Sequence, residues 1–187
     1  VVMARSVDVI GFDISARRIE GLKGGHDSNN EVDDATMQKT SCVFTADTAD
    51  LADANVYIVT VPTPLDGANN PDLGPLQKAS EMLSGCIKKG DIVVYESTVY
   101  PGVTEDFCGP ILEQGSGLTC GTDFYLGYSP ERINPGDTVH TVDKITKVVS
   151  GQTPDVAELL EKLYGLVNGG NIFVATDIKT AEASKAI

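Results

Sequence analysis

Short apolar runs and helical repeats alternate along the chain. The runs predict strands at 7–13, 42–45, 55–61, 91–96, 124–128, 147–150 and 172–174. Between them, apolar residues that recur every three or four positions predict helices, at 16–23, 47–51, 76–87, 101–112, 156–167 and from Asp177 to the end. Residues 24–41 are polar and rich in glycine and asparagine, which predicts a long loop that could hold a turn.

Local signals mark the ends of several helices. Ser15 can cap the first helix, and Pro101 can open the helix that runs toward Leu112. The run 88–90, Lys-Lys-Gly, is a C-terminal signal for the helix before it. The run 115–117, Gly-Ser-Gly, resembles the start of a phosphate loop, but it follows a helix where such a loop must follow a strand. We therefore interpret it as a turn.

The alternation predicts the fold class. Strands that are apolar on both faces and separated by helices are typical of a parallel sheet with helices on both sides. The sequence therefore predicts a doubly wound, mostly parallel α/β domain. Ligands of such sheets bind beyond the carboxyl ends of the strands. The residues just after each strand are thus the first candidates for function.

Composition removes some classes of function. A chain of 187 residues with 41% hydrophobic residues suits one domain or slightly more. The 14 basic and 27 acidic residues leave a net charge of -13, and no basic patch exists to neutralise phosphates, so we expect no nucleic-acid partner. No apolar run reaches the roughly 18 residues that span a bilayer, and no signal peptide is visible. We therefore expect no membrane partner and a cytoplasmic location.

The cysteines and histidines predict no metal site. No two cysteines form a CxxC pair, and His26 and His140 stand alone. Free thiols in a reducing cytoplasm are the preferred interpretation, with two disulfides as the alternative for an exported protein. The cysteines are Cys42, Cys86, Cys108 and Cys120.

Asp13 ends the first predicted strand. In dinucleotide-binding folds an acid at the end of the second strand binds the ribose hydroxyls, about 20 residues after a Gly-rich turn. Counting back from Asp13 places that turn upstream of Val1, so we expect the first strand and its Gly-rich loop to be missing here, with 1–5 as the end of the first helix. Alternatively, Asp13 only caps a turn, and Arg18 belongs to a solvated helix face.

Three later strand ends carry further candidates. Thr63 stands between two prolines, in a rigid loop that either holds it against a cofactor or is an ordinary stiff turn. Ser97 and Thr98 can hydrogen-bond a ribose, a nicotinamide or a substrate, and can also cap the next helix. Glu131 lies in a proline-stiffened loop as a candidate general base or water-positioning group. Its alternative is a surface pair with Arg132.

Taken together, these segments resemble the UDP-glucose/GDP-mannose dehydrogenase family. The resemblance is greatest to the bacterial branch that oxidises UDP-N-acetylhexosamines for capsule and surface polysaccharide. It extends in order through the whole chain, and the segments ESTVYPG and YSPERINPG are long and specific. The segments that carry it are GFD at 11–13, VPTP at 61–64, PDL at 71–73, GDIVVYESTVYPGV at 90–103, GYSPERINPG at 127–136 and AEASK at 181–185.

The resemblance implies a Rossmann-like NAD-binding domain over 1–176 and the start of a long central helix at 177–187. It implies NAD as cofactor, a UDP-sugar as substrate and a homodimer formed through that helix. These enzymes oxidise C6 of the sugar from alcohol to carboxylate with two NAD+, through an aldehyde, a cysteine thiohemiacetal and a thioester. The family's Gly-rich loop and catalytic cysteine lie outside the chain. The resemblance thus implies an inactive fragment that binds NAD weakly.

The family's functional residues map onto named positions. Asp13 and Arg18 would bind the adenosine ribose, and the other expected NAD contacts are Val61, Thr63 and Thr98. Glu131 would position or activate water for thioester hydrolysis, and Arg132 and Ile133 would lie along the substrate. Lys185 would contact the substrate and stabilise a developing oxyanion.

Each assignment has a plainer alternative. For Lys185 it is a helix pair with Glu182. For the whole protein the alternatives are a noncatalytic nucleotide-binding or assembly module and a hydroxyisobutyrate-type dehydrogenase. Dehydrogenases of that second type lack the SPERINPG loop.

Overall fold

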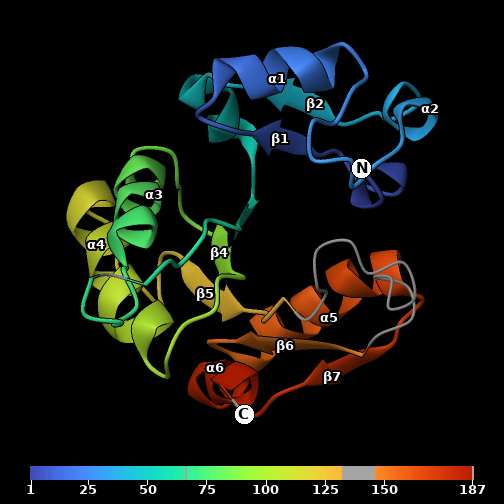
Figure 1. The fold of residues 1–187 in the computed structure, drawn as a ribbon. Coiled ribbons are helices and arrows are strands. Elements are labelled where there is room, and N and C mark those ends of the chain that lie inside the picture. The colour runs from blue at the N-terminus through green and yellow to red at the C-terminus, as the bar shows by residue number, and fades with distance from the viewer. Residues whose placement is uncertain (66, 132–145, 187) are drawn as a thin grey trace. The chain divides into compact units, whose positions relative to one another are not determined.

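The computed structural model describes residues 1–65, 67–131 and 146–186. The described residues fall into two compact units, 1–54 and 55–186. Each unit has its own sheet, and both sheets contain parallel strands (Figure 1). Within the described ranges, no helix is both long enough and apolar enough to cross a membrane.

The first unit is a parallel strand pair with a covering helix. β1 (Ile10–Phe12) pairs with β2 (Val43–Thr45), and α1 (Ala16–Lys23) packs against β2. Ser15 caps α1 as predicted, because its Oγ accepts a hydrogen bond from the Arg18 backbone N–H at 3.3 Å. The other elements are short: η1 (Met3–Arg5), α2 (Asp34–Met37) and η2 (Thr48–Asp53).

The second unit is a five-stranded sheet in the order β3-β4-β5-β6-β7. All neighbours are parallel except β5 and β6, which are antiparallel. This confirms the predicted doubly wound, mostly parallel fold. The antiparallel direction also brings the start of β6 to the end of the sheet where the carboxyl ends of β4 and β5 lie. The strands are β3 (Val56–Val59), β4 (Ile92–Tyr95), β5 (Tyr125–Tyr128), β6 (Lys147–Gly151) and β7 (Ile172–Val174).

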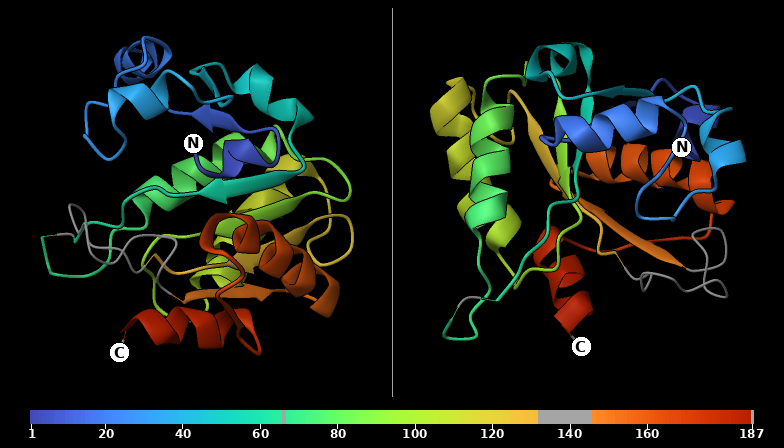
Figure 2. Two further views of the ribbon diagram at one scale, coloured as in Figure 1. Left: turned by 90° about the vertical axis from the view of Figure 1, so that its right-hand side faces the viewer. Right: turned by 45° about the horizontal axis from the view of Figure 1, so that its top comes forward.

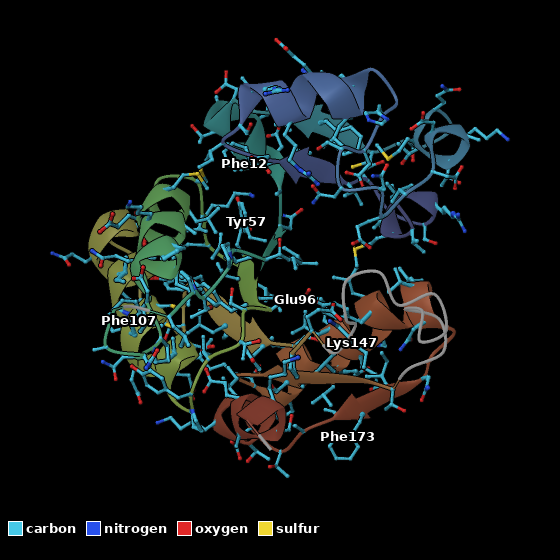
Figure 3. All side chains as sticks on the ribbon, viewed as in Figure 1. Phe12, Tyr57, Glu96, Phe107, Lys147 and Phe173 are labelled. Carbon is cyan, nitrogen blue, oxygen red and sulfur yellow. The ribbon has the colours of Figure 1, made fainter. Side chains whose placement is uncertain are left out.

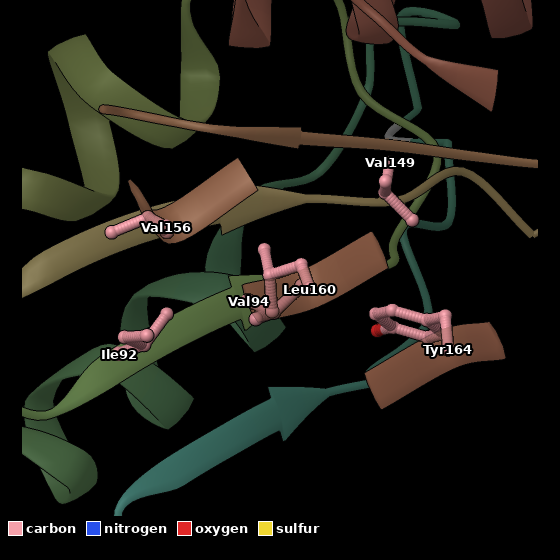
Figure 4. Close-up of a cluster of buried hydrophobic side chains, with 6 residues drawn as sticks. All are labelled: Ile92, Val94, Val149, Val156, Leu160 and Tyr164. Carbon is pink, nitrogen blue, oxygen red and sulfur yellow. The ribbon is translucent and has the colours of Figure 1, made fainter. Parts of the chain in front are cut away.

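Helices cover both faces of this sheet, which explains why its central strands are apolar throughout. Alternate residues of β4 point to opposite faces. On one face, α5 (Pro154–Asn168) closes a core that includes Ile92 and Val94 (Figure 4). On the other face, the Tyr95 hydroxyl lies 2.6 Å from Ser80 Oγ of α3 (Gly74–Ser84). Two views of the ribbon show α3 and α5 on opposite sides of the strands (Figure 2).

Several helix boundaries differ from the prediction, and glycines explain two of the differences. α3 ends at Ser84, and a turn leads from there to Gly90, whose φ of 91° places it in the left-handed region. The glycine signal at 88–90 therefore belongs to the turn before β4. The next helix begins at Val103, because Gly102 is left-handed with φ 99° and ends the turn that contains Pro101.

That helix starts with one π-helical stretch, Val103–Cys108, and continues as α4 (Gly109–Ser116). Gly117 follows α4 as a left-handed cap with φ 71°. The run 115–117 is thus a helix end and not a phosphate loop. The last helix, α6 (Ile178–Ala186), packs against β5 and β6.

Candidate functional site

The loops after β3 and β4 are joined at the carboxyl ends of their strands. Ser97 Oγ donates a hydrogen bond to the Val61 carbonyl at 2.5 Å, so the two loops keep a fixed spacing. They carry three of the residues expected to contact NAD. Val61 and Thr63 are partly buried on the first loop, and Thr98 is exposed on the second.

Thr63 carries a buried hydroxyl without a partner. Its Oγ1 has no hydrogen bond to any described residue, although close by the Asp72 backbone N–H donates a hydrogen bond to the Pro64 carbonyl at 2.7 Å. A buried polar atom without a partner costs about 1–3 kcal/mol. A ligand with hydroxyl or phosphate oxygens, such as NAD, would satisfy it. The residues after β3 therefore fit the expected cofactor.

In the first unit, the structure brings Asp13 and Arg18 together. Asp13 Oδ2 lies 3.5 Å from Arg18 Nε, and Asp13 Oδ1 accepts a hydrogen bond from the Ser15 backbone N–H at 2.8 Å. The local turn that was the alternative for Asp13 is therefore present. Both side chains remain about one-third exposed, so they can still contact a ligand.

Asp27 is a partner of Arg18 that the sequence pattern did not reveal. Its side chain is only 5% exposed, and its Oδ1 lies 3.4 Å from Arg18 Nη2. Burial alone would raise the pKa of Asp27, but backbone N–H donors from Asn29, Glu31 and Val32, together with Arg18, lower it. The carboxylate therefore stays charged and fixes the guanidinium. The Asp-Ser-Asn-Asn run is a turn signal that could have marked it.

A cluster of charged groups lies where β4 and β5 end and β6 begins. Lys147 Nζ is 3.2 Å from Glu96 Oε1 and 3.5 Å from Glu131 Oε2. Glu96 and Lys147 lie side by side in Figure 3. Their side chains are only 12% and 11% exposed, whereas that of Glu131 is 45% exposed. Glu131 is thus the carboxylate of this cluster that is most exposed to solvent.

Tyr164 of α5 completes this cluster from the core side. Its hydroxyl donates a hydrogen bond to Glu96 Oε1 at 2.6 Å. Burial, and then the negative charge of Glu96, raise the pKa of Tyr164 well above its ordinary value. The hydroxyl therefore remains protonated and remains a donor.

The two residues expected to be catalytic, Glu131 and Lys185, meet in the structure. Lys185 Nζ donates a hydrogen bond to the backbone carbonyl of Glu131. The helix pair between Glu182 and Lys185 is not formed, because the Glu182 carboxylate is fully buried and accepts hydrogen bonds from the backbone N–H groups of Gly102 and Thr104. Arg132 and Ile133 lie outside the described residues.

The four cysteines are free, and none has the properties of a nucleophile. Cys108 is fully buried, and burial raises the pKa of its thiol to about 11. Burial also raises the pKa of Cys42, Cys86 and Cys120. Because the thiolate is the reactive form, these thiols are poorly suited to covalent catalysis.

Sequence relatives include a dehydrogenase of a nucleotide sugar. The chain is 54% identical over 180 residues to the UDP-N-acetyl-D-glucosamine 6-dehydrogenase of Pseudomonas aeruginosa. It is 53% identical over 179 residues to Protein CapL of Staphylococcus aureus. Each match covers 96% of this chain but only 43% and 42% of those proteins. The chain thus spans less than half the length of these relatives.

Solved structures and a family model agree with this. The structure of UDP-D-ManNAc dehydrogenase from Pyrococcus horikoshii matches with a TM-score of 0.88 at 34% identity, over 98% of this chain and 45% of that one. A ternary complex of GDP-mannose dehydrogenase from Pseudomonas aeruginosa matches with a TM-score of 0.87 at 25% identity, over 99% of this chain and 44% of that one. The model of the NAD binding domain of the UDP-glucose/GDP-mannose dehydrogenase family matches residues 1–168. The chain therefore belongs to the UDP-glucose/GDP-mannose dehydrogenase family and carries its NAD-binding domain.

Proposed function

We propose that the whole protein is a cytoplasmic UDP-N-acetylhexosamine 6-dehydrogenase that makes precursors of capsular or surface polysaccharide. It would oxidise C6 of the sugar from alcohol to carboxylate with two NAD+. The observation that carries the proposal is the meeting of Glu131 and Lys185 where β5 ends, through the hydrogen bond from Lys185 Nζ to the Glu131 carbonyl. The high identity to a UDP-N-acetyl-D-glucosamine 6-dehydrogenase supports the choice of substrate class.

The overall reaction balances as one alcohol, two NAD+ and one water giving one carboxylate, two NADH and three protons. When bound, NAD+ would supply the hydride acceptor for each oxidation at C6. A cysteine thiol from outside this chain would add to the aldehyde, and the second oxidation would leave a thioester. Water then attacks the thioester carbonyl, the C–S bond breaks, and the thiol is released.

The described residues have separate roles in this scheme. Glu131 would position the water or take its proton. The Lys185 ammonium would stabilise negative charge that develops on the carbonyl oxygen. Asp13 and Arg18 would bind the adenosine ribose, and Val61, Thr63 and Thr98 would contact the rest of the cofactor. Substrate contacts would come from Arg132 and Ile133, and a homodimer would form through the helix that begins with α6.

The reaction is tested by its stoichiometry. Full-length protein is incubated with NAD+ and a panel of UDP-sugars, and NADH is counted per sugar consumed. We expect two NADH per sugar with a UDP-N-acetylhexosamine. One NADH per sugar would indicate a simple alcohol dehydrogenase, and no NADH with any sugar would refute the enzymatic function.

The role of Glu131 is tested by Glu131→Gln in the full-length protein. Without the carboxylate, hydrolysis should slow by about 10²–10⁴-fold, and a thioester adduct should accumulate in the intact-mass spectrum. The matched control is Glu161→Gln, which changes an exposed acid of α5 and should leave turnover unchanged. Normal turnover of Glu131→Gln without an adduct would remove Glu131 from the mechanism.

A further inference from the structure

We infer that Lys147 is a positioning residue that holds the Glu131 carboxylate in its working geometry. This inference rests on the proposed function, because it assigns Lys147 a part in the hydrolysis that Glu131 assists. The residue pattern around Lys147 does not indicate this role.

The antiparallel direction of β6 makes the contact possible. β6 runs opposite to β5, with Tyr128 opposite Ser150, so β6 begins beyond the end of β5 and its first residue, Lys147, comes within reach of Glu131. A parallel β6 would have placed Lys147 at the opposite end of the sheet, where β4 and β5 begin. The reversal therefore adds a lysine to the end of the sheet where the candidate site lies.

The buried side of the cluster fixes the lysine. Lys147 Nζ contacts Glu96 Oε1 at 3.2 Å, and Tyr164 donates to that same oxygen at 2.6 Å. The ammonium also lies 5.3 Å from the centre of the Tyr164 ring, within the range of a cation–π interaction. A free lysine side chain has many rotamers, but these contacts with the residue after β4 and with α5 select one position for its ammonium.

On the exposed side of the cluster, the fixed ammonium of Lys147 contacts Glu131. Lys147 Nζ reaches Glu131 Oε2 at 3.5 Å, while Lys185 binds the backbone carbonyl of the same residue. One lysine thus holds the carboxylate and another holds the backbone of Glu131. A base or water-positioning group depends on geometry first, and a displacement of 1 Å can cost about 10²-fold in rate.

The test uses Lys147→Met in the full-length protein, with NAD+ and the sugar that the wild-type protein oxidises. Methionine keeps the length of the side chain but removes the charge. We expect a burst of two NADH per active site, then turnover about 10²-fold slower than wild type, with a thioester adduct in the intact-mass spectrum. Lys147→Arg, which can bridge both carboxylates, should restore most of the turnover.

The matched control is Lys162→Met. Lys162 pairs with Glu158 on the exposed face of α5, so its loss removes a lysine salt bridge without touching the cluster. It should leave both the burst and the turnover unchanged. If Lys147→Met does not fold, Tyr164→Phe replaces it, because it frees the Glu96 oxygen while keeping Lys147, and the adduct should then accumulate to a smaller extent.

The outcomes separate this inference from the proposed function. Wild type that produces two NADH per sugar, with an equally fast Lys147→Met variant, overturns the role of Lys147 and leaves the proposed function standing. Equal slowing of the burst and of turnover, without recovery in Lys147→Arg, shows that Lys147 is only structural and also overturns the inference. If the wild-type protein produces no NADH with any UDP-sugar, both the proposed function and this inference are refuted.

Discussion

At the scale of single residues, close packing decides which positions of the sheet accept a side chain. A Cβ atom at Gly127 of β5 would lie 2.4 Å from Leu160 Cδ1, the end of a flexible side chain. Gly151 at the end of β6 is stricter, because its neighbours are backbone atoms. A Cβ there would lie 2.4 Å from the Ala157 nitrogen and 2.8 Å from the Val156 carbonyl carbon. The connection from β6 to α5 therefore requires a glycine.

Gly151→Ala should destabilise the protein by about 1–3 kcal/mol, the usual cost of overpacking. The backbone of α5 would have to move away from β6, and a fall in the midpoint of thermal unfolding would report it. Gly85→Ala is the control, because that glycine has ordinary helical dihedrals and its nearest neighbour would be 3.6 Å from the new Cβ. Equal midpoints for the two variants would contradict this account of Gly151.

At the scale of elements, one buried carboxylate connects α6 to the helix that follows β4. Glu182 is fully buried, and its two oxygens accept hydrogen bonds from Gly102 N at 2.5 Å and Thr104 N at 2.8 Å. These N–H groups belong to the start of a helix and have no partner within it. The negative charge also suits the positive end of the helix dipole.

Glu182→Ala should lower the free energy of unfolding by about 2–6 kcal/mol, because two buried N–H groups lose their acceptors at about 1–3 kcal/mol each. Denaturant unfolding followed by circular dichroism measures the loss. Glu161→Ala, which removes an exposed acid from α5, should change stability by less than about 0.5 kcal/mol. A Glu182→Ala variant as stable as this control would show that the carboxylate is dispensable.

At the scale of the whole molecule, acid should affect the protein through particular carboxylates and not evenly through its net charge of -13. Asp27 in the first unit is the clearest case, because backbone N–H donors and Arg18 lower its pKa despite its burial. A carboxylate whose pKa is lower in the folded than in the unfolded state stabilises the fold fully above its unfolded pKa. That contribution is lost as the pH falls through the lower, folded value.

The loop around Asp27 should therefore lose amide protection in acid. Hydrogen exchange measured from pH 7 down to about pH 2, corrected for the intrinsic rate, should accelerate at Asn29, Glu31 and Val32 below the ordinary aspartate range. Asp27→Asn should lack protection at these amides already at pH 7. Asp8→Asn, an exposed aspartate in the same unit, should behave as wild type, and unchanged protection in Asp27→Asn would refute the assignment.

The sequence alone determined the order and type of most elements. The apolar run at β4 and the repeat of α5 depend on side-chain burial with periods of two and 3.6 residues, which are visible along the chain. The proline-flanked Thr63 and the loop of Glu131 were found in the same way, because ligand sites of doubly wound sheets follow strand ends. Helix ends were less predictable. The glycines at 90 and 102 both have positive φ. The presence of a glycine in the sequence does not show whether that residue follows a helix or precedes one.

Only the tertiary structure decided which charges meet. Apolar periodicity reports how a strand is buried, but it reports neither the direction of the strand nor its neighbours. The antiparallel β6 therefore could not be foreseen, and with it the contacts of Lys147 with Glu96 and Glu131. Asp27 and Glu182 were hidden for the same reason, because their partners are backbone N–H groups, which every residue except proline carries. Such partners are specified by the path of the chain in space and leave no mark in the residue pattern.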